Sequence, residues 1–477
     1  MSTTPGGAPT GIFRKKPIAG NDDGPLERSI GLWQLTAIGI GAIIGAGIFA
    51  LAGEVAKNTA GPAVSVSFVI AGLASACAAL SYAEFGGMIP QAGSAYTYGY
   101  AVLGESIGWF IGWDLLLEYT AIVAVVAIGV SQYATFLLDA VGLDLPSWML
   151  GAPGTGDGHV VDLFAVLLCL GVAWLLNRGM QTSARVETWL VFVKVAIVVA
   201  VIVVGAFYVE PGNLTPYFPY GFGGAATGAA TVFFAVFGYD AMSTAAEESK
   251  EAERNLPKAI VLSLAIAMVL YLLAATVLTG MIDYRDVSAT AAYSEAFKSV
   301  GLPGFANVVA VGAIVGIVTV LFSFMLGASR VWYAISRDGL LPQWFARTNK
   351  HHSPHRPVWI VGLISALFAG FLPIDLVAEL TNIGILLAFV VVSAAVIVLR
   401  YRSPELDRTF RVPFMPVTPL LGIGFSLWLV SQLPLDTWIR FAAWFVLGAL
   451  VYAFYGYRNS RLGRGEAVEG EASADLG

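Results

Sequence analysis

Twelve apolar runs, most of them long enough to cross a bilayer, constrain what this sequence can fold into more than any other feature. A helix of about 20 apolar residues spans the hydrocarbon core. Only 12% of the residues are charged, against about 25% in a soluble domain. We therefore predict an all-α integral membrane protein with twelve transmembrane helices. The runs lie near residues 33–53, 62–88, 103–137, 160–177, 185–208, 222–247, 257–281, 305–333, 357–372, 376–399, 414–433 and 438–457.

The Lys and Arg residues indicate how these helices are oriented. If the N-terminal tail is inside, 21 of the 26 Lys and Arg residues fall on the inner side, four fall outside, and Lys194 lies within a run. An excess of Lys and Arg marks cytoplasmic loops. We expect a multi-pass protein of the cell membrane with both chain ends in the cytoplasm. Residues 1–30 form a cytoplasmic tail, residues 31–460 the transmembrane domain and residues 461–477 a disordered tail.

Two of the runs carry sequences that disfavour a continuous helix. Five of the fifteen residues in GIGAIIGAGIFALAG, from Gly39 to Gly53, are glycine, although glycine in a helix interior costs about 1 kcal/mol relative to alanine. The sixth run, GFGGAATGAATVFFAVFGYDAMSTAAEES, has glycines and a central FGYD sequence that puts Asp240 at membrane depth. We predict that both helices are broken within the membrane.

Broken helices at matching positions of two halves are typical of the binding site of a secondary transporter. The halves lie at about 33–208 and 222–399, and because each has five spans they insert with opposite topology. A break frees N–H and C=O groups that must face protein or a water-filled cavity. There the half-helix N-termini can receive a carboxylate and the carbonyls an ammonium. The alternative is that Gly41 and Gly45, four residues apart, only permit close helix packing.

Ionisable residues at membrane depth are a second group of candidates, because they are expensive there and usually functional. They are Asp114, Glu118, Lys194 and Asp240. Lys194 follows Arg185 by nine residues, about 13 Å along a helix axis, and its neighbours are apolar. Desolvation disfavours a charged amine, so Lys194 can release a proton and act as a proton carrier. The alternative is a permanent Lys–carboxylate pair that fixes helix packing.

Other classes of function find little support in the sequence. Cys77 and Cys169 are isolated in apolar runs, and we expect free thiols. The cluster His351, His352 and His355 is typical of a solvated basic loop, and no His or Cys cluster lies at membrane depth to serve an enzyme. We expect no enzymatic activity, no metal and no nucleic acid partner. The expected cofactor is none, with protons as the coupling ion.

Three stretches resemble a known transporter family: GIGAIIGAGIF in the first run, FFAVFGYDAMSTAAEESKEAERNLPKAI across the sixth and seventh, and RVWYAISRDGLLP after the eighth. Over about residues 25–460 the chain is similar to the amino acid–polyamine–organocation (APC) superfamily, and within it to the bacterial cationic amino acid transporter (CAT) family. The resemblance implies a LeuT-like 5+5 inverted repeat with broken helices 1 and 6, plus two C-terminal helices. It also implies transport of L-amino acids coupled to protons, with Lys194 in the place of a sodium ion.

The resemblance further implies which residues form the site. It assigns proton coupling to Lys194 and Glu118. It gives Ser323 and Phe324 a place at the side-chain end of the substrate. The positions that it puts around the substrate are Ile43, Gly45, Ala46, Gly47, Phe234, Ala235, Phe237 and Asp240.

The lining positions favour one class of substrate. Apart from buried network carboxylates they hold no acidic residue, and Ala46 stands where many relatives carry Thr. We expect proton symport of small or medium neutral L-amino acids, such as alanine, into the cell. The alternatives are an amino acid/amine exchanger, uptake of cationic amino acids, and a sensor without transport. The expected partners are the amino acid, protons and membrane lipids, and a small membrane protein or sterol-like lipid is left open.

Overall fold

The computed structural model describes residues 12, 14–15, 30–88, 94–178, 184–240, 242, 249–347 and 354–465. Within these ranges the regular structure is helical, apart from two isolated bridges, Ile30 with Ser249 and Leu150 with Asp162. Among the described residues, seven helical stretches are long and apolar enough to cross a membrane: Leu32–Met88, Glu105–Ala140, Thr188–Tyr208, Ala252–Met281, Pro303–Arg337, Ile374–Arg402 and Leu435–Asn459. Four shorter apolar helices accompany them: Leu163–Asn177, Gly221–Val236, His355–Phe371 and Val417–Ser431.

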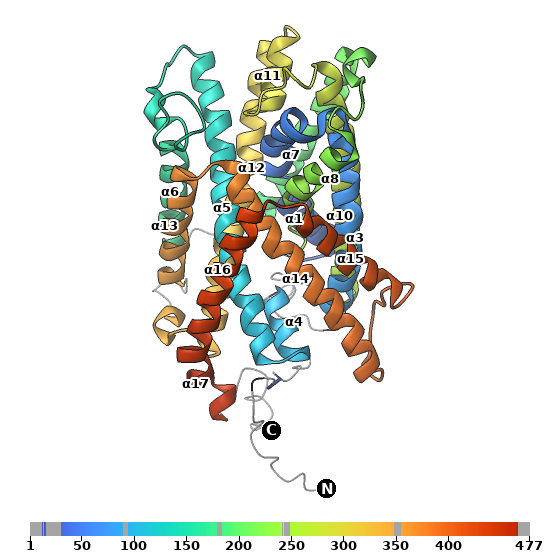
Figure 1. Ribbon diagram of the computed structural model, residues 1–477, viewed down its shortest axis with the longest axis vertical. Helices are drawn as coiled ribbons and strands as arrows, with labels where there is room; N and C mark the ends of the chain where they lie inside the picture. The colour runs from blue at the N-terminus through green and yellow to red at the C-terminus, as the bar shows by residue number, and fades with distance from the viewer. Residues whose placement is uncertain are drawn as a thin grey trace.

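Each apolar run of the sequence overlaps one of these stretches, and the first stretch covers two runs. The prediction of a multi-pass helical membrane protein is therefore confirmed. Figure 1 shows the helices as an upright bundle. The elements of the first half are α1 (Leu32–Ile43), η1 (Gly47–Leu51), α2 (Ala52–Val55), η2 (Ala56–Ala60), η3 (Gly61–Ala63), α3 (Val64–Met88), α4 (Ser94–Val102), α5 (Glu105–Ala140), η4 (Ser147–Met149), α6 (Leu163–Asn177), α7 (Ala184–Gly205), η5 (Ala206–Tyr208) and η6 (Pro211–Leu214).

The second half of the chain continues the same pattern of long helices and short connecting turns (Figure 1). Its elements are α8 (Gly221–Val232), η7 (Phe233–Val236), α10 (Ala252–Met281), α11 (Ala292–Ser299), α12 (Pro303–Arg337), η9 (Gln343–Ala346), α13 (His355–Phe371), α14 (Ile374–Arg402), α15 (Val417–Ser431), α16 (Leu435–Val451), η10 (Tyr452–Gly456), α17 (Tyr457–Asn459) and η11 (Leu462–Arg464).

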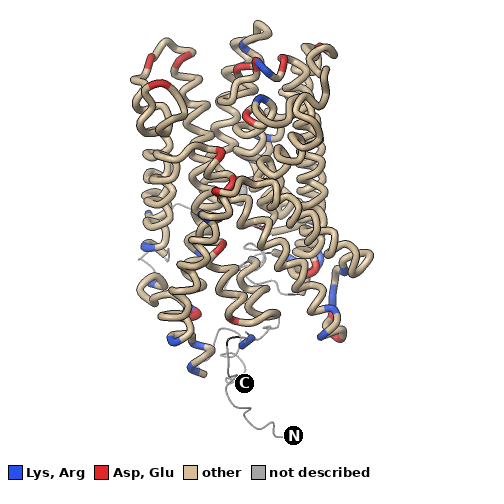
Figure 2. The backbone as a smooth tube through the Cα atoms, in the orientation of Figure 1, with Lys and Arg blue, Asp and Glu red and all other residues tan. Residues whose placement is uncertain are grey.

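Helix α5 lies at the centre of the bundle, and helices such as α7 lie at its rim. Every residue of α5 from Ile111 to Val130 is buried, and the helix packs against α12, α13 and α14. On α7 and the turn η5 that follows it, by contrast, Trp189, Phe192 and Phe207 are 64–85% exposed. A helix that is apolar all round is stable only in a core or in lipid, so this exposed face fits the membrane. Figure 2 shows most charged residues gathered at the two ends of the bundle.

Both helix interruptions that the sequence predicts are present. Helix α1 ends at Ile43, Ile44 is extended (φ −75°, ψ 104°), and helical structure resumes at Gly47. In the second half, α8 tightens into the 3₁₀ turn η7, Phe237 is extended (φ −105°, ψ 166°), and Gly238 has φ +123°. The left-handed φ of Gly238 is strained for a residue with a Cβ. Most of the sixth run after Asp240 lies outside the described residues.

The structure corrects the prediction for the segment between the second and third runs. The sequence of this segment, MIPQAGSAYTYGYAVLGE, is too polar to span a membrane and predicts a short interfacial segment. Most of α4 is instead buried, because its tyrosines find internal partners. The Tyr96 hydroxyl donates to Asp338 at 2.6 Å, and the Tyr98 ring stacks on Phe85 with centroids 5.0 Å apart. Tyr100 donates to Glu105 at 3.0 Å. The segment is therefore part of the core rather than a helix lying on the membrane surface.

Glu105 is a buried anchor for several distant parts of the chain. Its carboxylate, 0% exposed, accepts hydrogen bonds from Arg14 at 2.7 Å, Tyr452 at 3.0 Å and Ser460 at 2.5 Å, in addition to Tyr100. Its backbone N–H donates to the Arg14 carbonyl at 2.7 Å. One carboxylate at the start of α5 thus joins the N-terminal segment, α4 and the C-terminal helices.

Candidate functional site

The two interrupted helices meet, and glycine allows them to do so. A Cβ added at Gly47 would lie 2.3 Å from the Cβ of Ala235 and 2.4 Å from its Cα. A Cβ at Gly238 would lie 2.8 Å from the carbonyl of Ala42. Real Cβ atoms do not approach other heavy atoms this closely, so at both positions only glycine fits without moving backbone. The predicted substrate positions on the first and sixth runs are thereby brought together.

Lys194 occupies the interruption of the first helix. Its side chain is 0% exposed, and its ammonium donates to the carbonyl of Gly41 at 2.6 Å and to that of Ile44 at 3.1 Å. On α12 it donates to the carbonyl of Gly316 at 3.3 Å and to the hydroxyl of Thr319 at 3.0 Å. Carbonyls that lose their helical partners at a break need other donors. The Lys194 ammonium supplies them and ties α7, α1 and α12 together.

Other side chains satisfy further carbonyl groups of the interruptions. The Tyr271 hydroxyl on α10 donates to the carbonyl of Ile43 at 2.7 Å, and the Ser75 hydroxyl on α3 donates to that of Val236 at 2.8 Å. Asn382 on α14 donates to Ala230 at 2.9 Å, just before η7. Each of these hydrogen bonds stabilises a backbone conformation that helical hydrogen bonding alone would not maintain. The interruptions are therefore specifically stabilised, by side chains from four neighbouring helices.

Aromatic rings border the meeting point of the two helices. Phe234 and Phe237 are 7% and 4% exposed. The Phe237 ring lies 6.4 Å from that of Phe324 on α12, measured between centroids. Phe324 therefore lies beside a predicted substrate position. The Ser323 hydroxyl instead donates to the Thr319 carbonyl within its own helix, at 3.0 Å.

Buried carboxyl groups lie on the α5 side of the site. Tyr119, the residue that follows Glu118 in the chain, donates a hydrogen bond from its hydroxyl to Asp240. Glu118 and Asp114 are 1% and 2% exposed. Neither oxygen of Glu118 has a hydrogen-bond partner among the described residues. Glu118 is thus not hydrogen-bonded to Lys194, and its electrostatic neighbours are Asp114 and Asp240.

Several contributors were not foreseen from the sequence, namely Tyr271, Thr319, Tyr119 and Ser75. Thr319 lies four residues before Ser323 on the same face of an apolar helix, and this spacing is a signal that a closer reading could use. Tyr271, Tyr119 and Ser75 carry no such signal, because a single tyrosine or serine in an apolar run is ordinary core composition. Their partners become apparent only when the helices are packed.

The candidate metal and thiol residues can also be placed. The described residues contain no group of three or more His, Cys, Asp and Glu that could hold a metal ion. His351 and His352 lie outside the described residues, and His355 begins α13. Cys77 and Cys169 are free thiols, as predicted.

A family model described as amino acid permease matches residues 30–457, a range that contains both interruptions and Lys194. The chain belongs to the amino acid permeases of the APC superfamily. These proteins are membrane transporters, so this permease is a transporter and not an enzyme. The resemblance seen in the first, sixth and eighth runs is thereby confirmed.

Named relatives cover nearly the whole permease. It is 43% identical over 458 residues to a methylthioribose transporter of Bacillus subtilis, covering 95% of this chain and 99% of the relative. It is 42% identical over 460 residues to the branched-chain amino acid permease BcaP of the same organism, covering 94% and 99%. It is also 37% identical over 394 residues to the vacuolar cationic amino acid transporter 4 of Arabidopsis thaliana, covering 80% and 65%. Most of these names denote amino acid transport, so amino acid transport is the function that the family supports.

Proposed function

We propose that this permease is a proton-coupled symporter that imports small or medium neutral L-amino acids, alanine among them. Its architecture in this proposal is the twelve-helix, LeuT-like 5+5 inverted repeat with two additional C-terminal helices. The observation that carries the proposal is the Lys194 ammonium seated on the carbonyls of Gly41 and Ile44, where the first helix is interrupted.

The substrate would be held mainly by backbone. At the start of η1 no side chain caps the free N–H groups after Ala46, and the positive end of a half-helix favours a carboxylate. The Ile43 carbonyl, which keeps a second lone pair beside its bond from Tyr271, and the carbonyls near Phe234 would accept the substrate ammonium. At Gly45 and Gly47 the missing side chains leave room for Val320 and Ala235, and the ligand would meet the N–H groups of this segment. Asp240 would complete the site from the second interruption.

Proton coupling would follow from the donor count of Lys194. An ammonium has three N–H donors, and here four oxygens surround it. A neutral amine has two N–H donors, so losing the proton leaves more of these oxygens without a donor. The contacts of α1 with α7 and α12 then weaken, and the first helix can move. Glu118 would also transfer protons, on the side of the site where Asp240 lies.

The lining supports a neutral substrate. Ile43, Ala46 and Ala235 are apolar, Phe234 and Phe237 are aromatic, and Asp240 already accepts from Tyr119. Apart from Asp240, these positions offer no acidic partner for a cationic side chain. We place the permease in the cell membrane with both chain ends in the cytoplasm.

Amino acid exchange is the second candidate mechanism. Four oxygen contacts favour a charged Lys194 at rest, and an ammonium that never loses its proton would be a fixed structural link. Uptake would then require a counter-substrate inside rather than protons.

The test is uptake of each radiolabelled L-amino acid into proteoliposomes, with and without an inward proton gradient. Symport predicts uptake of neutral amino acids that the gradient stimulates in empty vesicles. Uptake that ignores the gradient but requires amino acid inside would establish exchange. Binding without any uptake would indicate a sensor.

A further inference from the structure

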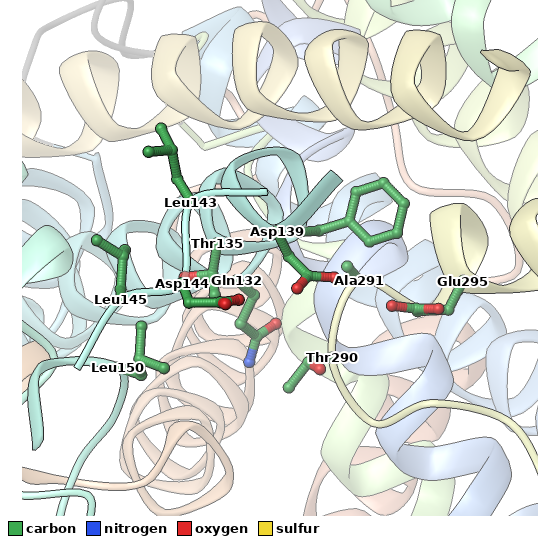
Figure 3. Close-up of a pocket in the computed structure, with 11 residues that line it drawn as sticks. Gln132, Thr135, Asp139, Leu143, Asp144, Leu145, Leu150, Thr290, Ala291 and Glu295 are labelled. Atoms are coloured by element: carbon green, nitrogen blue, oxygen red, sulfur yellow. The ribbon is translucent and has the colours of Figure 1, made fainter. Parts of the chain in front are cut away.

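A pocket of about 250 Å³ lies between the end of α5 and the segment that leads into α11 (Figure 3). Pockets for drug-sized ligands hold about 300–1,000 Å³, so this pocket suits a molecule of amino-acid size. It is at the end of the bundle that carries α11, away from α17 (Figure 1). From α5 and the loop after it come Gln132, Phe136, Asp139 and Asp144, and from the opposite wall come Thr290 and Glu295.

The charges around the pocket are unbalanced. Three carboxylates line it, from Asp139, Asp144 and Glu295. Lys298 reaches two of them, with Nζ 3.7 Å from Asp139 and 3.8 Å from Glu295. Asp144 makes no hydrogen bond or ion pair with any described residue. One lysine against three carboxylates leaves a negative pocket, which attracts and concentrates cationic groups.

Gln132 provides an independent indication of a ligand with N–H donors. Its Oε1 is buried and has no hydrogen-bond partner among the described residues. Figure 3 shows its side chain lying between Asp144 and Asp139. A buried carbonyl oxygen without a donor is unfavourable, and an ammonium has three donors and no acceptor. A cationic group with N–H donors would therefore satisfy both the Gln132 oxygen and the carboxylates.

The pocket walls also contact the first interrupted helix. The neighbour of Gln132, Tyr133, donates to the carbonyl of Phe49 in η1 at 2.8 Å. On the opposite wall, a Cβ at Gly53 in α2 would lie 2.3 Å from that of Ala292. Both walls thus pack directly on the helical segment that follows the interruption. A ligand in the pocket would be next to the helical segment that follows the first interruption.

We propose that this pocket is a second binding site, which takes the ammonium group of the transported amino acid before the amino acid reaches the interruptions. The assignment rests on the proposed function, since it takes the substrate of that function as its ligand. The ammonium lies among Asp144, Glu295 and the oxygen of Gln132, and the apolar side of Phe136 and the neighbouring leucines faces the substrate side chain.

The test combines binding and uptake of radiolabelled alanine by Asp144→Asn and Gln132→Leu. Asp157→Asn is the matched control, since Asp157 is an exposed carboxylate in the same loop that does not line the pocket. Both pocket variants are expected to raise the KM of uptake roughly three- to fivefold with kcat unchanged, as is usual for loss of one partly exposed ionic contact or hydrogen bond. Raising the potassium chloride concentration should raise the KM of the wild type more than that of Asp144→Asn.

Binding in detergent separates this proposal from the proposed function. Gly45→Val should block the central site and leave weak alanine binding, and adding Asp144→Asn to Gly45→Val should remove that binding. If Asp144→Asn and Gln132→Leu match the control in KM and salt dependence, the pocket binds no substrate, although transport stands. If the wild type binds none of the amino acids, both proposals are wrong. The Asp144 carboxylate can also be probed with a carboxyl-modifying reagent. If metal cations protect Asp144 from this reagent and alanine does not, the pocket is a metal-cation site and its assignment to an amino acid is wrong.

Discussion

The backbone of Gly47 approaches Ala235 so closely that an added Cβ would lie 2.3 Å from the Ala235 side chain. One residue begins the helix after the first interruption, and the other lies in the turn before the second. The two residues are 188 positions apart in the sequence, yet their contact fixes the spacing of the two broken helices. The first run therefore requires a glycine at position 47, where the two broken helices touch.

Gly47→Ala is therefore expected to abolish alanine uptake. The methyl group meets backbone that cannot yield cheaply, and overpacking of this kind costs about 1–3 kcal/mol. Gly171→Ala is the control, because Gly171 lies in helix α6 and a Cβ there would meet nothing within 4 Å. We expect it to keep most uptake. Equal uptake by the two variants in proteoliposomes would show that the contact with Ala235 does not matter.

Tyr271→Phe should weaken substrate binding. It removes the hydroxyl that donates to the Ile43 carbonyl, and losing the partner of a buried group costs about 1–3 kcal/mol. We expect the KM for alanine to rise roughly tenfold. Tyr293→Phe is the control, since the Tyr293 hydroxyl has no hydrogen-bond partner among the described residues. A normal KM for Tyr271→Phe would mean that the position of Ile43 does not set affinity.

Asp240→Asn should leave the protein folded but impair transport. The asparagine oxygen can still accept from Tyr119, so the melting temperature in detergent should change little. The amide cannot ionise as the Asp240 carboxyl can, and we expect uptake to fall at least about tenfold. If this variant takes up alanine as well as the wild type does, Asp240 has only a structural role.

Arg14→Ala should destabilise the protein without changing substrate affinity. It leaves the buried Glu105 carboxylate without its cationic partner, a loss that typically costs about 3–5 kcal/mol. Burial lowers the pKa of Arg14, the hydrogen bond and charge of Glu105 raise it, and the pKa is raised overall, so the guanidinium stays charged at neutral pH. Lys15→Ala is the neighbouring exposed control. Melting in detergent checks this, and equal melting temperatures would contradict the role of the ion pair.

Much of the site could be predicted because membranes make certain residues expensive. A lysine in an apolar run and glycines in two matching helices have few structural explanations, so Lys194 and Gly47 stood out. The partners of Lys194 did not, because Gly41, Gly316 and Thr319 meet only when three helices pack. The burial of α4 was missed for the same reason. Its polar sequence predicts a surface segment, and the buried partners of its tyrosines, Asp338 and Glu105, lie beside it only in the folded bundle.

The central claim is that Lys194 couples protons to transport, and Lys194→Met tests it most directly. Methionine keeps a long apolar side chain but has no N–H donor. The measurement is alanine uptake into proteoliposomes with and without an inward proton gradient, beside alanine binding in detergent. Proton coupling through Lys194 predicts that binding survives in the variant and stimulation by the gradient is lost. Stimulation equal to that of the wild type would contradict the account.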